Sequence, residues 1–332
     1  MNKYYDILYL IVDLYKNNFI RWIDLCGETE FIIVESDNIN TLPNKSNTKY
    51  IIANYLNLQL SNHYQKIEQI ISIGGFSVHN RGKIEAQKRG VALTTIPIPL
   101  SNDSFGTNRC SSDNENENNP SFESKYPNKC IFFINELINF GIDNSLGGIG
   151  ESIGLYYSII DYCKKKQIDT KWDVLHFICQ LFSEIISLYQ IKNHECLKKI
   201  IQALVLKNLV MRANNDHEIG CGIDHFFARE YEDKYKFNHG KAVYLGAIIS
   251  SFLFPEWEKW GLSTKLLLNN GLLLKLISNN DINDISSMDL CLFTKEALDK
   301  RKTRNSMLRY LSDKEIIDKQ NIFRNGIYQT YI

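Results

Sequence analysis

Four short apolar runs in the first half of the chain have the length and the β-branched content of buried strands. They cover residues 31–34, 69–73, 91–96 and 130–134. Residues 83–89, which lie between the second and third runs, have helical spacing and are followed by Gly90, a residue type that often ends helices. A βαβ unit, and therefore a parallel sheet, is predicted by this order of elements: a strand, a glycine-rich turn, a helix and a second strand.

Other parts of the first half have weaker patterns. Residues 1–25 have apolar positions at helical spacing and predict an opening helix, whereas residues 50–60 fit a strand or a helix equally well. Residues 110–129 contain a polar and acidic run of low complexity at 113–120. We expect residues 110–129 to form a solvated surface loop.

From about residue 140 the strand patterns stop and apolar residues recur at helical spacing. Helices are predicted at 149–165, 172–189, 196–214, 223–233, 240–254, 264–279, 294–311 and 313–324. The predicted fold class is therefore an α/β N-terminal domain with a parallel, Rossmann-like sheet, residues 1–139, followed by an all-α C-terminal domain, residues 140–332. We expect a binding cleft between the two domains.

The composition excludes several classes of protein. A chain of 332 residues is long enough for about two domains. The 38 basic residues balance the 38 acidic ones, which argues against a dedicated nucleic-acid binder. Hydrophobic residues make up 44% of the chain, which excludes wholesale disorder, and no apolar run is long enough to predict a membrane span.

The cysteines indicate a reducing compartment. The chain has eight of them and no CxxC pair, which argues against zinc ribbons and thioredoxin-like motifs. Several, including Cys179, lie among apolar residues, as reduced and packed thiols do. Asp6 and Asp13 interrupt any signal-peptide core, so we expect a cytoplasmic protein.

Three features of the sequence are candidates for chemistry, and the first is the pair Gly74-Gly75 between a predicted strand and helix. Glycines at this position let phosphate oxygens approach the backbone, and the N–H groups of the helix N-terminus favour anions. A tight turn between strand and helix requires glycine just as well, so both interpretations stay open.

The second feature is the loop that follows the strand at 91–96. It contains Ser101, Asp103, Ser104 and Arg109, and ligands of open parallel sheets bind beyond the carboxyl ends of the strands. The alternative is an Asx or Ser turn, in which the side chains satisfy the backbone of their own loop.

The third feature is an acid and two histidines in the helical half. Glu151, His225 and His239 offer one carboxylate and two imidazoles, which are suitable ligands for Zn²⁺ or Fe²⁺ with one position left for substrate. The alternative is that each histidine caps a helix or packs in the core.

In their order these features resemble the superfamily of dehydroquinate synthase, glycerol dehydrogenase and glycerol-1-phosphate dehydrogenase, which has the iron-containing alcohol dehydrogenase-like fold. The Gly-Gly-Gly-x-x-x-Asp cofactor turn of that family corresponds to residues 74–80, and its Pro-Thr-x-x-Ser-x-Asp loop corresponds to residues 97–103. Its acidic metal ligand, after Gly-x-Gly, falls on Glu151, and its two histidine segments fall on 222–225 and 239–243.

The resemblance covers most of residues 70–255, with several departures. Phe76 stands where the cofactor turn has its third glycine, Asn80 where it has aspartate, and Ile98 where the next loop has threonine. Gly154 stands where dehydroquinate synthases carry a catalytic lysine.

Two arginines occupy further family positions. Arg229 replaces a second histidine one helical turn after His225, and Arg109 falls where the synthases carry another lysine. Two guanidinium groups can hold a phosphate or carboxylate in a bidentate manner, and the alternative for each is a surface arginine.

The resemblance implies a metal- and NAD(P)-dependent oxidoreductase that acts on a small polyol or polyol phosphate. Its implied metal ligands, with Zn²⁺ or Fe²⁺, are Glu151, His225 and His239; its catalytic residues are Asp103, Arg109 and Arg229; and its residues for NAD or NADP are Gly74, Gly75, Phe76, Asn80, Ser101 and Ser104. Asp103 would orient the substrate.

Two other functions are compatible with the same motifs. One is a sugar-phosphate cyclase like dehydroquinate synthase. It is favoured because the acidic residue is glutamate, Glu151, and not aspartate, and it is disfavoured because Gly154 stands in place of the lysine. A non-catalytic descendant is suggested by Phe76 and Asn80, and the retained metal ligands argue against it. The expected partner is a small anionic molecule, with no nucleic acid and no membrane, and a homodimer follows from the resemblance alone.

Overall fold

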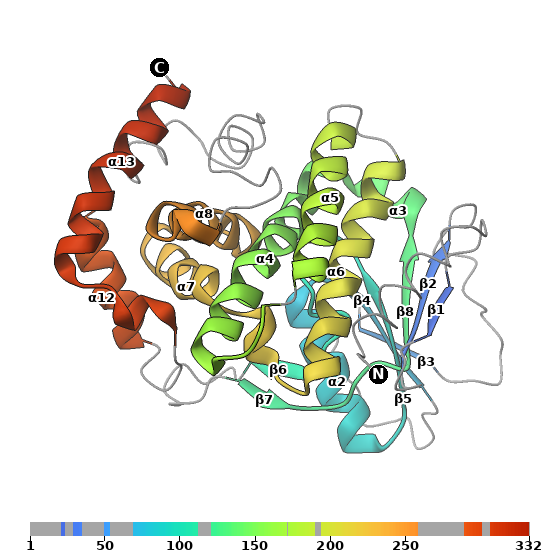
Figure 1. Ribbon diagram of the computed structural model, residues 1–332. Coiled ribbons are helices and arrows are strands. Elements are labelled where there is room, and N and C mark those ends of the chain that lie inside the picture. The colour runs from blue at the N-terminus through green and yellow to red at the C-terminus, as the bar shows by residue number, and fades with distance from the viewer. Residues whose placement is uncertain are drawn as a thin grey trace. The chain divides into compact units, whose positions relative to one another are not determined.

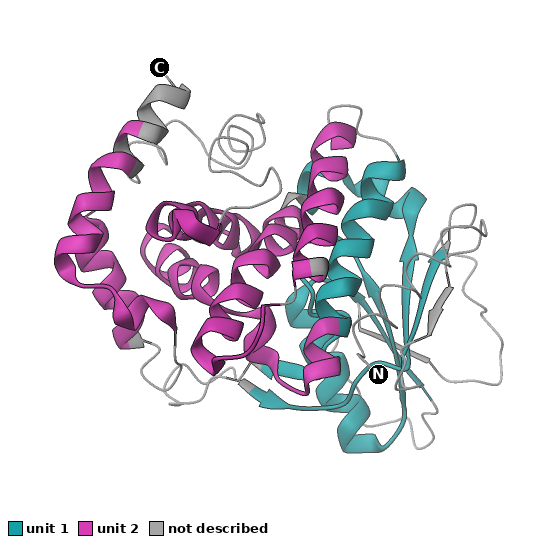
Figure 2. Cartoon of the chain, viewed as in Figure 1, with its two compact units in different colours: residues 1–145, 193–209 teal, residues 146–192, 210–332 magenta. Residues whose placement is uncertain are grey.

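The computed structural model forms two compact units. Unit 1 consists of Met1–Ser145 and Asn193–Leu209, and unit 2 of Leu146–Lys192 and Val210–Ile332 (Figure 2). The residues that the structure describes are 21–23, 29–34, 50–53, 69–111, 121–170, 172–189, 194–257, 289–300 and 306–331.

Unit 1 contains a six-stranded sheet (Figure 1). In spatial order its strands are β1 (Arg21–Ile23), β2 (Glu30–Val34), β8 (Lys129–Phe133), β5 (Ala92–Pro97), β4 (Gln69–Gly74) and β3 (Tyr50–Ala53). Strands β1 and β2 are antiparallel, and all the other neighbours are parallel. The segment that fitted a strand or a helix equally well therefore begins as the edge strand β3.

Helix α2 (Phe76–Arg89) connects β4 to β5 and confirms the predicted βαβ unit. Adjacent residues of β4 are buried on opposite faces of the sheet, where Ile70 packs with Ala86 of α2 and Ile71 packs with Ile96 of β5. Burial on both faces is typical of parallel sheets and explains the unbroken apolar runs. The helix ends at Gly90, whose φ of 66° lies in the left-handed region.

The register of β4 and β5 brings two predicted functional segments to one edge of the sheet. Gly74 pairs with Pro97 at the carboxyl ends of the two strands. The backbone N–H of Ile98 also donates a hydrogen bond to the carbonyl of Gly74 at 3.1 Å. The cofactor turn and the loop of Asp103 therefore leave the sheet side by side.

The predicted surface loop at 110–129 contains regular structure at its described ends. Strands β6 (Arg109–Ser111) and β7 (Ser121–Glu123) form an antiparallel pair, and β8 begins at Lys129. Cys110 is buried, and a polar loop would not bury it. Residues 112–120, which include the acidic run, lie outside the described residues.

The remaining described elements are helical. Unit 1 includes α3 (Ile134–Phe140), the 3₁₀ turn Ile142–Ser145 and most of α6 (His194–Asn214). Unit 2 includes α4 (Leu146–Lys166), α5 (Trp172–Tyr189), α7 (Ile223–Tyr235), α8 (His239–Leu253), α12 (Leu290–Lys300), α13 (Asp313–Tyr331) and the 3₁₀ turns His217–Gly220, Pro255–Trp257 and Met307–Tyr310. The fold class is therefore as predicted, a parallel α/β sheet region followed by helices.

Two helix predictions need correction. The helix predicted at 294–311 is wrong as one element, because α12 ends at Lys300 and Ser306 has an extended backbone whose side chain accepts a hydrogen bond from Leu308 N–H to begin a 3₁₀ turn. The opening helix predicted at 1–25 is wrong at its end, where Arg21–Ile23 pairs with β2. Its first twenty residues and the helix predicted at 264–279 lie outside the described residues.

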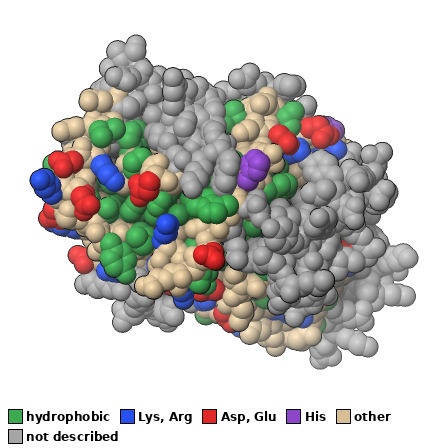
Figure 3. Space-filling model, in the orientation of Figure 1, with side chains coloured by type: hydrophobic (Ala, Val, Ile, Leu, Met, Phe, Trp, Pro, Cys, Tyr) green, Lys and Arg blue, Asp and Glu red, His purple; other side chains and the backbone are tan. Residues whose placement is uncertain are grey.

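On the face in Figure 3, acidic and basic side chains are interspersed with apolar ones. Among the described helices, none combines the length and the apolar character that crossing a bilayer requires.

Candidate metal centre and cofactor turn

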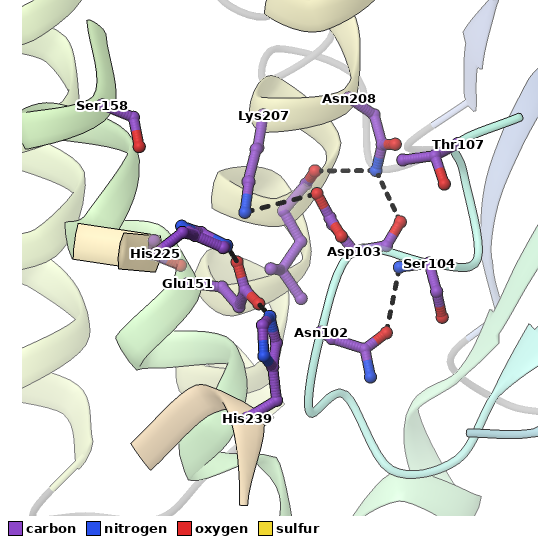
Figure 4. Close-up of polar contacts among 12 residues, drawn as sticks. Asn102, Asp103, Ser104, Thr107, Glu151, Ser158, Lys207, Asn208, His225 and His239 are labelled. Atoms are coloured by element: carbon purple, nitrogen blue, oxygen red, sulfur yellow. Dashed lines mark hydrogen bonds and ion pairs between the residues drawn. The ribbon is translucent and has the colours of Figure 1, made fainter. Parts of the chain in front are cut away.

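Three helices of unit 2 bring together the three residues predicted as metal ligands. Glu151 lies in α4, His225 lies in α7 and His239 is the first residue of α8. One ligand atom from each residue can be chosen so that all three lie within 4.8 Å of one another. His239 Nε2 is 2.7 Å from Glu151 Oε1, and His225 Nε2 is 3.7 Å from Glu151 Oε2, so each imidazole faces one carboxylate oxygen (Figure 4).

Glycines next to two of these residues explain how the helices approach so closely. A Cβ atom built on Gly150 would lie 1.9 Å from the carbonyl oxygen of Gly240, and one built on Gly240 would lie 2.1 Å from Gly147 Cα. Helices α4 and α8 therefore meet backbone to backbone. The motif residues that accompany Glu151 and His239 in the sequence are thus required by packing, in addition to any role with a ligand.

Each imidazole has a second carboxylate on its other nitrogen. Asp224 Oδ2 is 2.6 Å from His225 Nδ1, and Glu232 Oε1 is 2.5 Å from His239 Nδ1. Neither acid was predicted from the sequence as part of the site. The position of Asp224 directly before a candidate ligand was a usable signal, whereas Glu232 meets His239 only because α7 and α8 pack together.

The carboxylates change the proton affinity of His239. Burial alone would lower the pKa of this imidazole, but the carboxylates of Glu151 and Glu232 outweigh burial and raise the pKa well above its ordinary value. A site that favours a cation on its imidazoles is also electrostatically suited to a metal cation.

In unit 1, the carboxylate of Asp103 forms an ion pair with a lysine that the sequence analysis missed. Asp103 Oδ2 is 3.3 Å from Lys207 Nζ in α6, and the lysine side chain is 1% exposed (Figure 4). Lys207 lies in the apolar run 203–210, where a buried charge is unusual enough to be a signal. The backbone carbonyl of Asp103 also accepts a hydrogen bond from Asn208 Nδ2 at 3.3 Å.

The same loop contains the Asx turn that was the alternative interpretation. Asn102 Oδ1 accepts a hydrogen bond from Ser104 N–H at 2.9 Å, so this side chain satisfies its own loop. Ser101 is half-buried and Ser104 is buried. The Asx turn and the ion pair of Asp103 coexist, because they use different side chains.

Lys83 holds the far end of this loop. Its Nζ donates hydrogen bonds to Thr107 Oγ1 at 3.3 Å and to the carbonyl of Arg109 at 2.8 Å. Burial lowers the pKa of the Lys83 amine to about 8. Lys83 thus joins α2 to the loop, a connection that its position in the predicted helix did not indicate.

The predicted cofactor turn is open at Gly75. Gly74 has a φ of 146°, which disfavours other residue types, and Gly75 precedes α2 without a side-chain cap. A Cβ built on Gly75 would have no atom within 4 Å. Phe76 is 44% exposed as the first residue of α2, and Asn80 is buried one turn later.

Comparison with solved structures identifies the fold. A probable glycerol dehydrogenase from Sinorhizobium meliloti 1021 is 12% identical with a TM-score of 0.59, over 79% of this chain and 78% of that chain. Glycerol dehydrogenase from Schizosaccharomyces pombe is 13% identical with a TM-score of 0.57, over 80% and 71%. Maleylacetate reductase from Agrobacterium tumefaciens is 13% identical with a TM-score of 0.54, over 78% and 75%. This chain has the glycerol dehydrogenase fold.

The sequence alone does not reach this result by direct comparison, because no protein-family model and no curated protein sequence matches it. The fold that the resemblance implied is nevertheless confirmed, although the identity to the solved structures is only 12–13%.

Within the glycerol dehydrogenase fold of this chain, both candidate arginines have carboxylate partners. Arg229 in α7 is half exposed and lies 3.9 Å from Glu232 and 3.7 Å from Asp233 of its own helix. Arg109 in β6 lies 3.5 Å from Glu123 across the β6–β7 pair. These contacts fit the alternative of structural surface arginines, and a role in substrate binding stays a prediction for both.

Proposed function

We propose that this protein is a metal- and NAD(P)-dependent oxidoreductase that acts on a small polyol, on a polyol phosphate or on the corresponding carbonyl compound. The observation that carries the proposal is the meeting of Glu151, His225 and His239 from three different helices. Glu151 and His225 are buried and His239 is partly exposed. An acid and two histidines that converge in this way, with both Nε2 atoms aimed at one carboxylate, are characteristic of metal sites.

The donor set fits a divalent transition metal. Two imidazole nitrogens and one carboxylate are the ligands of many catalytic sites, and Zn²⁺ or Fe²⁺ suits them better than Ca²⁺ or Mg²⁺, which prefer oxygen ligands. A cation held by Glu151, His225 and His239 supplies Lewis-acid polarisation of a substrate hydroxyl or carbonyl group, and a nicotinamide supplies the redox chemistry.

The chain's own residues would bind and orient the reactants. Gly75 leaves the backbone open to a pyrophosphate at the start of α2, directly after Gly74 at the end of β4. Asp103 is kept in place by Lys207, and its carboxylate is suited to accept a hydrogen bond from a substrate hydroxyl. Ser101 and Ser104 lie in the same loop as further hydrogen-bonding groups.

An anionic substrate is part of the proposal. One of the structurally similar proteins is named a maleylacetate reductase, and maleylacetate is a dicarboxylate. The fold therefore accommodates an acidic substrate in at least one protein. In this chain Arg109 and Arg229 are partly exposed cations that suit such a group.

The cyclase alternative loses support from the surroundings of Gly154. A Cβ built on Gly154 would lie 2.5 Å from Asp224 Oδ2 and 2.6 Å from Val243 Cγ1. The lysine that dehydroquinate synthases carry at this position would therefore collide with the helices around it. We do not propose a lysine-dependent cyclisation for this chain.

A cytoplasmic location belongs to the same proposal. Cys179 is buried, and burial raises the pKa of its thiol to about 12. A thiol of this kind is protonated and inert, as expected of a packed cysteine in a reducing compartment.

The test combines metal content, cofactor binding and turnover. The protein is loaded with Zn²⁺ or Fe²⁺, NADH and NADPH are titrated by nicotinamide fluorescence, and polyols and their phosphates are screened by nicotinamide absorbance. We expect saturable binding of at least one nucleotide and net oxidation of a polyol. No binding up to millimolar nucleotide would overturn the proposal in favour of a non-catalytic protein, and product formation without net change in absorbance would restore the cyclase.

The variant His225→Ala tests the metal ligands. We expect it to lose bound metal and activity, because two remaining ligands hold a catalytic cation poorly. Metal content is measured by elemental analysis after dialysis, and folding by circular dichroism. His176→Ala, in α5, is the matched control and is expected to retain its metal. Unchanged metal content in His225→Ala would show that the ligands are assigned wrongly.

A further inference from the structure

The two histidines of the candidate metal centre are held by their Nδ1 atoms in the same way. Asp224 contacts His225 Nδ1 at 2.6 Å, and Glu232 contacts His239 Nδ1 at 2.5 Å. An ionised carboxylate only accepts hydrogen bonds, so each Nδ1 carries the proton of the bond. The Nε2 atoms are then the positions from which both imidazoles can bind a cation, and both face Glu151.

Asp224 is fixed by contacts to both of its carboxylate oxygens. Oδ2 contacts His225, while Oδ1 accepts a hydrogen bond from Ser158 Oγ at 2.6 Å. Ser158 Oγ in turn accepts a hydrogen bond from Gly222 N–H at 2.7 Å, directly before α7. The Asp224 side chain is 0% exposed, so its charge is compensated entirely within the protein.

The packing around Asp224 leaves no room for a side chain at two neighbouring glycines. A Cβ on Gly154 would lie 2.5 Å from Asp224 Oδ2, and a Cβ on Gly246 would lie 2.1 Å from the carbonyl oxygen of Asp224. Two glycines on different helices, α4 and α8, thus adjoin one buried acid. A buried carboxylate is costly unless it is well bonded, and Asp224 meets this condition only through its contacts to His225 and Ser158.

Glu232 reaches His239 from the same helix that carries His225. It lies two helical turns after His225, so both side chains project from one face of α7. Its side chain is 22% exposed, and Arg229 lies 3.9 Å from it. Glu232, the carboxylate that contacts His239, is therefore more accessible and is partly balanced by a cation. Asp224, the carboxylate that contacts His225, is buried.

We infer that Asp224 and Glu232 are positioning residues that orient His225 and His239 toward a divalent cation at Glu151. The inference rests on the proposed metal site and goes beyond its three ligands. With neutral imidazoles, Glu151, Asp224 and Glu232 contribute three negative charges, which favour a dication. Carboxylates behind metal-bound histidines also raise the basicity of the ligand and hold its orientation.

The experiment measures metal binding rather than activity. The affinity for Zn²⁺ is determined by competition with a chromophoric chelator, and the Co²⁺ form is examined by its visible absorption spectrum. The variants are Asp224→Asn and Glu232→Gln, which keep the shape of each side chain and remove its charge. The control is Asp233→Asn, which removes the adjacent carboxylate of α7 that pairs with the same Arg229.

We expect Asp224→Asn and Glu232→Gln each to weaken Zn²⁺ binding by about 10–100-fold and to shift the Co²⁺ bands. Asp233→Asn should keep the wild-type affinity and spectrum. Wild-type affinity and an unchanged Co²⁺ spectrum in both test variants would overturn the inference. If His225→Ala also binds Zn²⁺ with wild-type affinity, the proposed metal site itself fails, so the two failures are distinguishable.

A folding defect in Asp224→Asn does not prevent the test. Glu232 is at the surface of α7, so its variant still reports on His239. Ser158→Ala removes one hydrogen bond to Asp224 and leaves the acid in place. We expect a several-fold loss of Zn²⁺ affinity in Ser158→Ala, and wild-type affinity and spectrum there would overturn the role of Asp224.

Discussion

At the scale of single residues, Asp161 shows what burial does to a carboxylate in unit 2. Its Oδ1 accepts hydrogen bonds from Ser306 Oγ at 3.1 Å and from Met307 N–H at 2.7 Å. Burial nevertheless raises the pKa of this carboxyl from 3.8 to about 6, and the hydrogen bonds offset only part of that effect. The charged form is therefore disfavoured in the folded protein relative to the unfolded one.

This pKa predicts a specific dependence of stability on pH. Because the folded pKa is raised, Asp161 lowers the free energy of unfolding above pH 6, and this penalty disappears as the pH falls toward 4. Asp161→Asn keeps an acceptor and has no charge. We expect it to exceed the wild type by about 1–3 kcal/mol at pH 7 and to match it near pH 4. Urea unfolding at both pH values measures the difference, and a pH-independent difference would contradict the assignment.

Some residues of the candidate site could be predicted from the sequence, and others could not. Glu151, His225 and His239 are chemically distinctive and stand in motifs, so they could be predicted. Asp224 and Lys207 could not be assigned a role in the same way. Their positions, directly before His225 and within an apolar run, were signals, but only the structure shows that both side chains are buried, at 0% and 1% exposure, and which residues they contact.

At the scale of elements, the centre depends on how closely three helices approach. The backbone of α4 touches that of α8 at Gly150 and Gly240, and the backbone of α7 meets α8 at Gly246. Glycine in a helix interior is normally destabilising, so its repeated presence at these contacts indicates that close packing outweighs the loss of helix propensity. The same contacts bring Glu151 and His239 within 2.7 Å.

This packing predicts a strong effect of one added methyl group. In Gly150→Ala the new Cβ would lie 1.9 Å from the carbonyl oxygen of Gly240, so α4 and α8 must separate. We expect a loss of about 1–3 kcal/mol in the free energy of unfolding and weaker Zn²⁺ binding, measured by urea unfolding and chelator competition. Gly75→Ala, where the Cβ meets nothing within 4 Å, is the control and should leave Zn²⁺ affinity unchanged. Wild-type stability in Gly150→Ala would show that the helices are less tightly packed.

At the scale of the whole molecule, the proposed binding sites for the nucleotide and for the metal are built from residues of different units. The predicted cofactor turn lies in unit 1, at the carboxyl ends of β4 and β5, and the candidate metal ligands lie in unit 2. Helix α6 contributes residues to both units, since its first part counts with unit 1 and its last turn with unit 2. The sequence predicted a boundary near residue 140 and had no means of assigning parts of one continuous helix to two units.

We expect metal binding to increase the free energy of unfolding of the whole protein. A metal that binds only the folded protein raises the free energy of unfolding by about 2.7 kcal/mol when its free concentration is a hundred times Kd. We expect this increase for the wild type with Zn²⁺, measured by thermal or urea unfolding, and none for His225→Ala. An equal increase in both proteins would indicate that Zn²⁺ binds elsewhere.

The sequence by itself determined the type and order of most of the described elements and singled out three candidate metal ligands. These follow from local periodicity, from glycines at element ends and from rare residue types in motifs, all of which act over a few neighbouring positions. Helix α5 was predicted with the bounds that it has, Trp172–Tyr189. The split between α12 and the turn at Met307 was missed, because it depends on the extended backbone at Ser306.

Only the tertiary structure decided how those ligands are supported. Ser158 and Asp224 are 66 residues apart, and Asp103 and Lys207 belong to a loop and a helix that are distant in the chain. Whether such side chains meet depends on the packing of whole helices, to which each residue contributes little. Gly154 is the clearest case, since the positions of Asp224 and Val243 leave no room for a side chain there and the sequence alone does not show it.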